Sequence, residues 1–133
     1  MKPGDYLTKG QGICKGTPKY TNNIESSTQG AYEFGLDENG CLTFYDHLNQ
    51  DPEVVVWQNK DMCGDVLRLE DDGRLVLYGE DGNPVGPGLG VCDEDIKGTV
   101  QFEAKMDDSM ELRAGSKTLW SIALDGVPTG DCV

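Results

Sequence analysis

Basic residues are scarce in this sequence. Of its 133 residues only 11 are Lys or Arg, against 24 Asp and Glu, and the formal net charge is −13 at pH 7. Nucleic-acid phosphates and anionic membrane surfaces repel such a chain, so we expect no nucleic-acid partner. The negative charge does not exclude cationic partners, neutral glycans or divalent cations. The simpler interpretation of the charge is a soluble, solvated surface.

Long apolar runs are missing as well. The longest β-branched stretch is Val54–Val56, next to Trp57, far shorter than the roughly 20 apolar residues of a membrane-spanning helix. We therefore expect no membrane insertion. No apolar segment follows Met1–Gly4, so a signal peptide is not predicted. We expect the chain either to start at a mature N-terminus with an added Met or never to be exported.

Histidine and the common catalytic motifs are nearly absent. His47 is the only histidine, and because it follows Tyr45-Asp46 we predict a surface turn residue rather than a catalytic base. There is no Gly-x-Ser-x-Gly motif and no phosphate-binding Gly loop. We therefore expect that the protein is not an enzyme and has no cofactor. The acidic run Asp93–Asp95 lacks the alternating oxygen ligands of a strong calcium loop, and we interpret it as a solvated loop.

Closely spaced cysteine pairs are missing too. Zinc ligands normally come in such pairs, so we expect no metal site. Wide spacing is typical of disulfides in an oxidising compartment and predicts an extracellular protein. The odd count leaves one thiol free or bonded to another chain. The five cysteines are Cys14, Cys41, Cys63, Cys92 and Cys132.

What the chain does contain is a series of turns between alternating apolar segments. Glu38–Gly40, Asp71–Gly73 and Asp107–Ser109 each separate two such segments, and Asn-Gly and Asp-Gly are strong hairpin signals. The apolar faces match across the first two hairpins if each loop has three residues and ends in a left-handed Gly. The predicted core pairs are Leu36 with Leu42 and Leu69 with Leu75.

A short predicted strand follows each hairpin, at 54–57, 84–85 and 118–120. Each unit of a hairpin and a strand has an apolar face that it cannot bury alone, so the units must pack together. The polar stretch Pro18–Thr28 is predicted to be a long loop. We predict a single all-β domain over residues 1–133, with repeats at about 31–58, 65–87 and 99–121.

The second hairpin carries a recognisable motif. Residues 70–78 read Glu-Asp-Asp-Gly-Arg-Leu-Val-Leu-Tyr. This stretch resembles the Gln-x-Asp-x-Asn-x-Val-x-Tyr motif that the monocot mannose-binding (bulb-type) lectins carry in three copies. Asp72, Val76 and Tyr78 match the motif, Glu70 replaces Gln and Arg74 replaces Asn.

Other segments also resemble this family. Gly4–Gly10 is similar to its first strand, and Val56-Trp57 and Leu119–Ser121 are similar to its tryptophan-containing strands. The resemblance implies the β-prism II fold, in which three four-stranded antiparallel sheets surround a pseudo-threefold axis with tryptophans near the centre. The middle repeat has Gly86 where a Trp is expected.

The resemblance also bears on the cysteines. It implies a Cys41–Cys63 disulfide. Cys92 and Cys132 resemble two extra cysteines that join two chains in curculin-type members. They can meet within one chain or across a homodimer; an intrachain bond would close a loop of about 40 residues, worth roughly 3–4 kcal/mol. We favour the intrachain bond, which leaves Cys14 free or available to another chain.

In the family, each motif binds one mannose through hydrogen bonds from Gln, Asp, Asn and Tyr and through contact with Val. The middle repeat is the only credible site. Here Glu70 only accepts hydrogen bonds when ionised and Arg74 only donates them, so if they pair across the hairpin they occupy each other. We predict weakened or lost mannose binding. The predicted carbohydrate-binding residues are Glu70, Asp72, Arg74, Val76 and Tyr78.

The two outer repeats have lost more of the motif. We predict that all three hairpin faces are solvated rather than working mannose sites. The aligned residues are Asp37, Asn39, Cys41, Thr43 and Tyr45 in the first repeat and Asp107, Glu111 and Arg113 in the third.

Two functions follow from these patterns. The first is a carbohydrate-binding, lectin-like module with weakened or lost mannose binding. The alternative is an extracellular structural or protein-interaction domain that keeps the lectin fold without sugar binding. A glycan or glycoprotein, another protein and a second copy of the chain are the partners that stay open.

Overall fold

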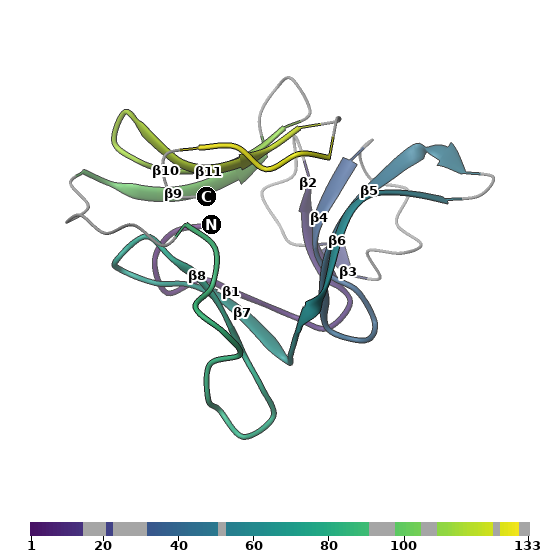
Figure 1. The fold of residues 1–133 in the computed structure, drawn as a ribbon, viewed down its shortest axis with the longest axis horizontal. Coiled ribbons are helices and arrows are strands. Elements are labelled where there is room, and N and C mark those ends of the chain that lie inside the picture. Colours follow the sequence, from purple (N-terminus) through teal and green to yellow (C-terminus); the bar gives the residue numbers. More distant parts are fainter. Residues whose placement is uncertain are drawn as a thin grey trace.

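The computed structural model describes residues 1–14, 21–22, 32–50, 53–90, 98–104, 109–123 and 126–130. Within these segments the secondary structure is strand, turn and bend, without helix. In particular, they contain no helix long and apolar enough to cross a membrane. The strands form three antiparallel sheets, which lie on three sides of a common interior (Figure 1). The all-β prediction is therefore confirmed.

The first sheet has five strands in the order β3-β2-β4-β5-β6. The stretch predicted to be a long loop contains β3, because residues 21–22 pair with β2. His47 lies within β5 rather than in the predicted turn, since the pairing of Gln50 with Glu53 extends the β5–β6 hairpin beyond it. The strands are β2 (Gln11–Cys14), β3 (Thr21–Asn22), β4 (Tyr32–Leu36), β5 (Cys41–Gln50) and β6 (Glu53–Cys63).

The middle sheet consists of β1 (Tyr6–Thr8), β7 (Val66–Leu69) and β8 (Leu75–Tyr78), in the order β1-β7-β8. The chain then returns along the open edge of β8 and forms two isolated bridges, Tyr78 with Pro84 and Leu75 with Leu89. No regular strand forms there, because proline has no amide hydrogen to donate and the φ angles of Gly86 and Gly88 are +75° and +90°.

The third sheet consists of β9 (Val100–Ala104), β10 (Met110–Ala114) and β11 (Lys117–Ile122). A bridge between Ser121 and Thr129 adds to its edge at β11. The three sheets therefore have five, three and three strands, where the family resemblance implies four in each. Most of the third predicted loop, Asp107–Ser109, lies outside the described residues.

The first two hairpins have the predicted loops. Gly40 and Gly73 have φ angles of 85° and 87°, so both are in the left-handed region that suits glycine. In each loop this glycine donates its backbone N–H to the residue before the loop, 3.0 Å to the Asp37 carbonyl and 3.1 Å to the Glu70 carbonyl. The predicted pairs Leu36 with Leu42 and Leu69 with Leu75 are confirmed.

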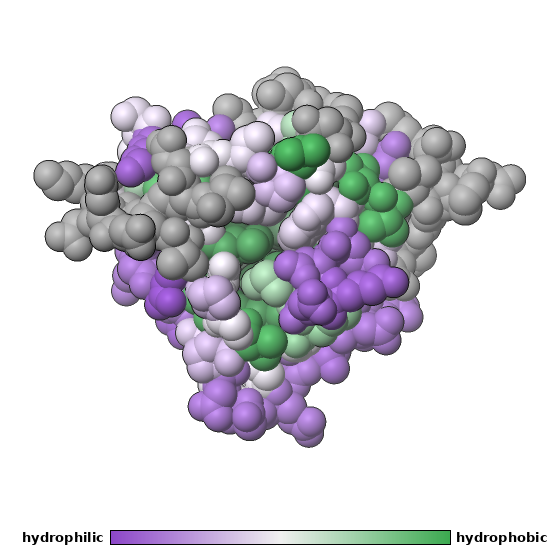
Figure 2. All heavy atoms as spheres, viewed as in Figure 1, coloured by the Kyte–Doolittle hydropathy of each residue, from purple (hydrophilic) through white to green (hydrophobic). Residues whose placement is uncertain are grey.

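Aromatic side chains join the first and third sheets at the centre of the core. The ring of Phe34 lies 6.0 Å from Trp57, 5.3 Å from Phe102 and 5.7 Å from Trp120. Each fully buried side chain of this size stabilises the fold by about 1.5–3 kcal/mol. The space-filling view shows hydrophobic residues near the centre of this face and hydrophilic ones along its lower edge (Figure 2). The middle sheet adds the fully buried Leu7, Leu67, Leu69, Leu75 and Leu77.

No tryptophan reaches the core from the middle sheet. Gly86 is exposed, and its neighbour Val85 packs against the core instead. The two tryptophans, Trp57 and Trp120, contact each other with their ring centroids 5.8 Å apart.

A disulfide joins the two ends of the β5–β6 hairpin. Cys41 and Cys63 are directly opposite each other in the register and are bonded, 22 positions apart in sequence. This prediction is confirmed. The predicted Cys92–Cys132 bond and the side chain of Cys14 lie outside the described residues.

Candidate functional site

The β7–β8 hairpin has an apolar inner face and a polar outer face. Its leucines point into the core and are fully buried. Because side chains alternate along a strand, the residues between the leucines share the outer face of the middle sheet. They are Arg68, Glu70, Arg74, Val76 and Tyr78, and they include four of the five predicted sugar-binding residues.

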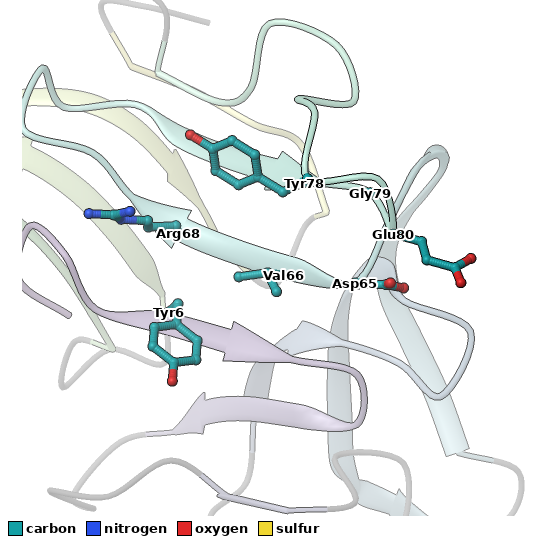
Figure 3. A pocket seen from close by; sticks show the side chains of 8 residues that line it. Tyr6, Asp65, Val66, Arg68, Tyr78, Gly79 and Glu80 are labelled. Atoms are coloured by element: carbon teal, nitrogen blue, oxygen red, sulfur yellow. The ribbon is translucent and has the colours of Figure 1, made fainter.

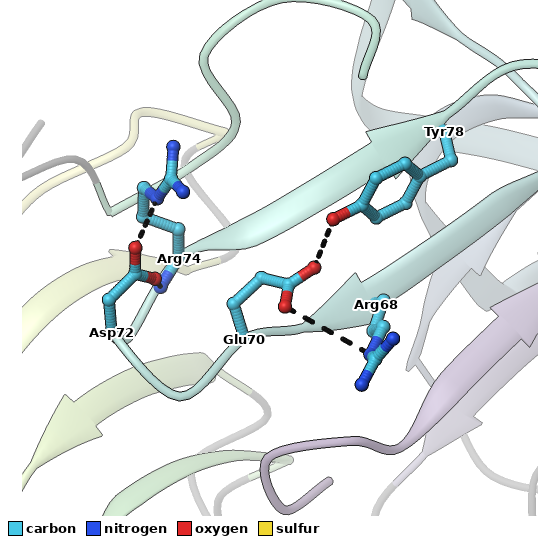
Figure 4. A network of polar contacts seen from close by, with 5 residues as sticks. All are labelled: Arg68, Glu70, Asp72, Arg74 and Tyr78. Atoms are coloured by element: carbon cyan, nitrogen blue, oxygen red, sulfur yellow. Dashed lines mark hydrogen bonds and ion pairs between the residues drawn. The ribbon is translucent and has the colours of Figure 1, made fainter. Parts of the chain in front are cut away.

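Glu70 and Tyr78 are joined by a hydrogen bond across this face. The Tyr78 hydroxyl donates to a carboxylate oxygen of Glu70, while the other oxygen of Glu70 lies 4.0 Å from Arg68 Nε (Figure 4). The hydrogen bond to Glu70 is the main cause that raises the pKa of Tyr78 above its ordinary value of 10.0. The Tyr78 hydroxyl proton is therefore already donated to Glu70 and is not available to a ligand.

Arg74 pairs with Asp72 rather than with Glu70. Its Nε lies 2.8 Å from Asp72 Oδ2, and its backbone N–H donates to Asp72 Oδ1 at 3.1 Å (Figure 4). The Glu70 N–H does donate to the Arg74 carbonyl across the hairpin, so the backbone placement was predicted correctly. The condition under which Glu70 and Arg74 would occupy each other is not met, because the Arg74 side chain pairs with Asp72 inside the tight loop.

Val76 lies on the same face but is only 3% exposed. The segment that follows β8 and returns along its edge, residues 79–90, covers Val76. A Cβ built on Gly88 would lie 3.3 Å from Val76 Cγ2. The predicted site residues thus form two separate polar pairs around a covered valine.

A groove opens on the same outer face, between Tyr78 and the neighbouring strand β1. Its volume is about 540 Å³. Tyr6 of β1 is directly opposite Arg68, and Val66 is directly opposite Tyr78, so the two tyrosines stand on either side of β7 (Figure 3). The lining residues are Tyr6, Asp65, Val66, Arg68, Tyr78, Gly79, Glu80 and Gly82.

The charges in this groove are divided between its ends. Arg68 lies at one end, and Asp65 and Glu80 lie at the other (Figure 3). Arg68 and Asp65 are three positions apart in the chain, which corresponds to about 10 Å of extended backbone. Asp65 is paired with Lys9 at 2.9 Å.

The turn that carries Glu80 is held by its own hydrogen bonds. The Gly79 N–H donates to the Asn83 carbonyl at 2.9 Å. The backbone N–H and the side-chain amide of Asn83 both donate to Asp81, at 3.0 and 3.1 Å. These bonds, the backbone one first, hold the pKa of Asp81 below its ordinary 3.8. The acidic end of the groove is therefore attached to an ordered turn.

Sequence reasoning found Tyr78 but missed most of this groove. Tyr6 comes from a strand about 60 residues earlier in the chain, and its pairing with β7 leaves no local pattern in the sequence. The alternation of Tyr6 with the buried Leu7 was the one available signal that its side chain faces outward.

Most of the corresponding face of the first repeat is buried, contrary to the prediction, although Asn39 is exposed as predicted. Asp37 accepts the backbone N–H groups of Asn39 and Cys41, both at 2.9 Å, and the Gln58 side-chain amide at 3.0 Å. These strands lie inside a five-stranded sheet that is buried on both faces at this point. Asp37, Thr43, Tyr45 and Cys41 are all less than 10% exposed.

The third repeat is intermediate. Arg113 is 39% exposed and lies between two carboxylates, 3.4 Å from Glu103 and 3.8 Å from Glu111. Glu111 is buried, so the solvated face predicted here is wrong for this residue. Asp107 lies outside the described residues. Within the described part of the chain, no group of three or more His, Cys, Asp or Glu could hold a metal ion.

No protein-family model and no curated protein sequence matches this chain. Among solved structures, the chain is similar to a domain-swapped lectin dimer from Mycobacterium smegmatis. The two are 20% identical, the match covers 92% of this chain and 97% of the other, and the TM-score is 0.28. A TM-score of 0.28 is too low to assign a fold. The all-β fold is therefore established by the sheets and strand registers of this chain alone.

Proposed function

We propose that this chain is a non-catalytic carbohydrate-binding module that works through the groove of the middle sheet. The observation that carries the proposal is the pair of tyrosines, Tyr6 and Tyr78, beside the carboxylates of Asp65 and Glu80 in one concavity. Tyrosine rings offer flat apolar surface to the C–H face of a sugar. Carboxylates accept hydrogen bonds from hydroxyl groups.

We propose that the module is a single domain of three repeats with the β-prism II fold of the bulb-type lectins. The three-sided arrangement of sheets and the two matching hairpin loops support this assignment. The Cys41–Cys63 disulfide supports an extracellular location. A glycan or a glycoprotein is the partner, and a homodimer is compatible with it.

Simple mannose binds weakly or not at all in this proposal. Glu70 and Tyr78 use their polar groups on each other, as do Asp72 and Arg74, and Val76 is covered. Each lost hydrogen bond to a sugar costs about 1 kcal/mol, so two or three losses reduce affinity roughly a hundredfold. Mannose binding created by Glu70→Gln with Arg74→Asn would identify the middle repeat as a decayed mannose site.

A glycan array followed by calorimetry on the best-bound glycan tests the proposal. We expect Tyr6→Ala and Tyr78→Ala each to weaken binding about tenfold or more. Val55→Ala is the matched control, because Val55 is also a large exposed side chain, 42% exposed, but lies on β6 of the first sheet. An array without any bound glycan would instead favour the structural or protein-interaction alternative. Binding that survives both tyrosine variants would place the site on another surface.

A further inference from the structure

Among the groove-lining residues, Arg68 is the one that carries a positive charge. Its side chain is half exposed, and its ion pair with Glu70 is long, at 4.0 Å. Glu70 already accepts the Tyr78 proton and does not itself line the groove. Arg68 therefore keeps guanidinium hydrogens for a ligand, whereas the Tyr78 hydroxyl has no proton left to donate.

The opposite end of the groove offers acceptors. Glu80 is exposed on the ordered turn 79–83, and Asp65 uses one carboxylate oxygen for Lys9. A ligand that fits both ends needs an anionic acceptor about 10 Å or less from hydroxyl donors. Between the two ends it needs an apolar face for the tyrosine rings.

We propose that the groove selects an acidic sugar, a hexuronic acid residue whose carboxylate binds Arg68 and whose hydroxyl groups donate to Asp65 and Glu80. This inference rests on the proposed function. The arginine fork matches the two oxygens of a planar carboxylate, and such charge-assisted bonds are the strong ones. A neutral hexose has the hydroxyl groups but gives Arg68 only a neutral acceptor.

The net charge of the chain does not outweigh this local match. At about 0.15 M salt the screening length is roughly 8 Å, so distant surface carboxylates contribute little at the groove. At the groove itself, the charged lining residues and their ion-pair partners are Arg68 and Lys9 against Asp65, Glu80 and Glu70, a local net charge of −1. The positive charge of Arg68 lies at the end away from Asp65 and Glu80 (Figure 3), and this is the end at which an anionic ligand would bind.

The test compares sugars that differ only at C6. Methyl glucuronide, galacturonide and mannuronide are each titrated against the matching methyl glucoside, galactoside and mannoside by NMR, near neutral pH and about 0.15 M salt. In at least one pair we expect the uronide to bind about tenfold more tightly, or about 1.4 kcal/mol. Arg68→Gln should remove that preference, and Arg68→Lys, which keeps the charge but not the fork, should reduce it.

Arg113→Gln is the matched control, because Arg113 is also a part-exposed arginine beside two glutamates on an outer sheet face. It should leave the preference intact. Neutral sugars that bind as well as their uronides in every pair would overturn the inference and leave the proposed function standing. A preference that survives Arg68→Gln would also overturn it. Absence of binding to all six sugars and to the glycan array would overturn both proposals.

Discussion

Tyr78 is the residue at which the electrostatics of the outer face can be measured directly. Its hydrogen bond to Glu70 stabilises the protonated phenol and raises its pKa above 10.0. Because the folded-state pKa is raised, the stability from this bond is present below pH 10 and is lost as the pH rises through the raised value.

We therefore expect one of the five tyrosines to ionise late in a spectrophotometric titration of the folded protein. In Glu70→Ala this late step should move down toward 10.0. Superimposable titration curves for the wild type and the variant would show that the hydrogen bond is not made in solution.

Asp37, unlike the polar residues of the outer face of the middle sheet, is buried. Its carboxylate holds the first hairpin loop together through hydrogen bonds. Asp37→Ala would remove the acceptor of the Asn39 and Cys41 N–H groups, and the Gln58 amide would keep Thr43 Oγ1 at 3.4 Å. The bond to Cys41 is buried and the other two are part-buried. An unsatisfied buried donor costs roughly 1–3 kcal/mol, so we expect about 2–3 kcal/mol of lost stability in urea unfolding.

Asp72→Ala is the control for Asp37→Ala, because Asp72 belongs to the equivalent loop of the second hairpin but is 54% exposed. Its ion pair with Arg74 is a surface pair and contributes about 0–1 kcal/mol. Equal losses of stability in the two variants would contradict the structural role given to Asp37.

At the scale of the elements, two tight turns allow two costs of replacing a glycine to be measured separately. One is the strain of a left-handed backbone, and the other is the collision of an added Cβ with its neighbours. Gly40 and Gly82 have nearly the same φ angle, +85° and +80°. A Cβ on Gly40 would collide with the carbonyl oxygen of Gly64, whereas nothing lies within 4 Å of a Cβ on Gly82.

We expect Gly82→Ala to cost about 1–2 kcal/mol, the strain of a left-handed alanine alone. Gly40→Ala carries the same strain and also a backbone displacement, worth roughly 1–3 kcal/mol more. Thermal or urea unfolding of the two variants measures the difference. A larger loss of stability for Gly82→Ala than for Gly40→Ala would contradict the close contact of Gly40 with the Gly64 carbonyl.

The hairpins were predictable from sequence because everything that determines them is local. A three-residue loop ending in glycine, with leucines on either side, specifies the register of β4 with β5 and of β7 with β8. The pairing of β1 with β7 and of β2 with β3 joins short segments without a distinctive pattern. The five-stranded sheet, and with it the burial of the first hairpin face, could not be predicted for that reason.

At the scale of the whole molecule, the same limit applies to the candidate site. The motif residues 70–78 are consecutive and were found, but the groove also needs Tyr6, Asp65 and Glu80 from other segments. The sequence also could not show that Arg74 prefers Asp72, since that choice depends on the path of one loop.

We propose one further covalent link, Cys92–Cys132, within the chain. It would close a loop of about 40 residues and stabilise the fold by roughly 3–4 kcal/mol. Peptide mapping and mass spectrometry of the unreduced protein should show this bond in a monomer. A covalent dimer linked through Cys92 or Cys132 would refute the intrachain bond, whereas one linked through Cys14 would not.

The short strand β1 connects ligand binding in the groove to the local detachment of β1 from β7. It spans three residues, which pair with Val66–Arg68 of β7. Two backbone hydrogen bonds continue this pairing just before β1, from Gly4 N–H to the Leu69 carbonyl and from Leu69 N–H to the Asp5 carbonyl. Short peripheral strands open more easily than core strands, and their amide hydrogens exchange through that opening. If β1 detaches, Tyr6 leaves the groove, so a ligand held between the two tyrosines must oppose detachment by its own binding energy. Saturating ligand should therefore slow deuterium uptake in β1 much more than in β10 of the third sheet.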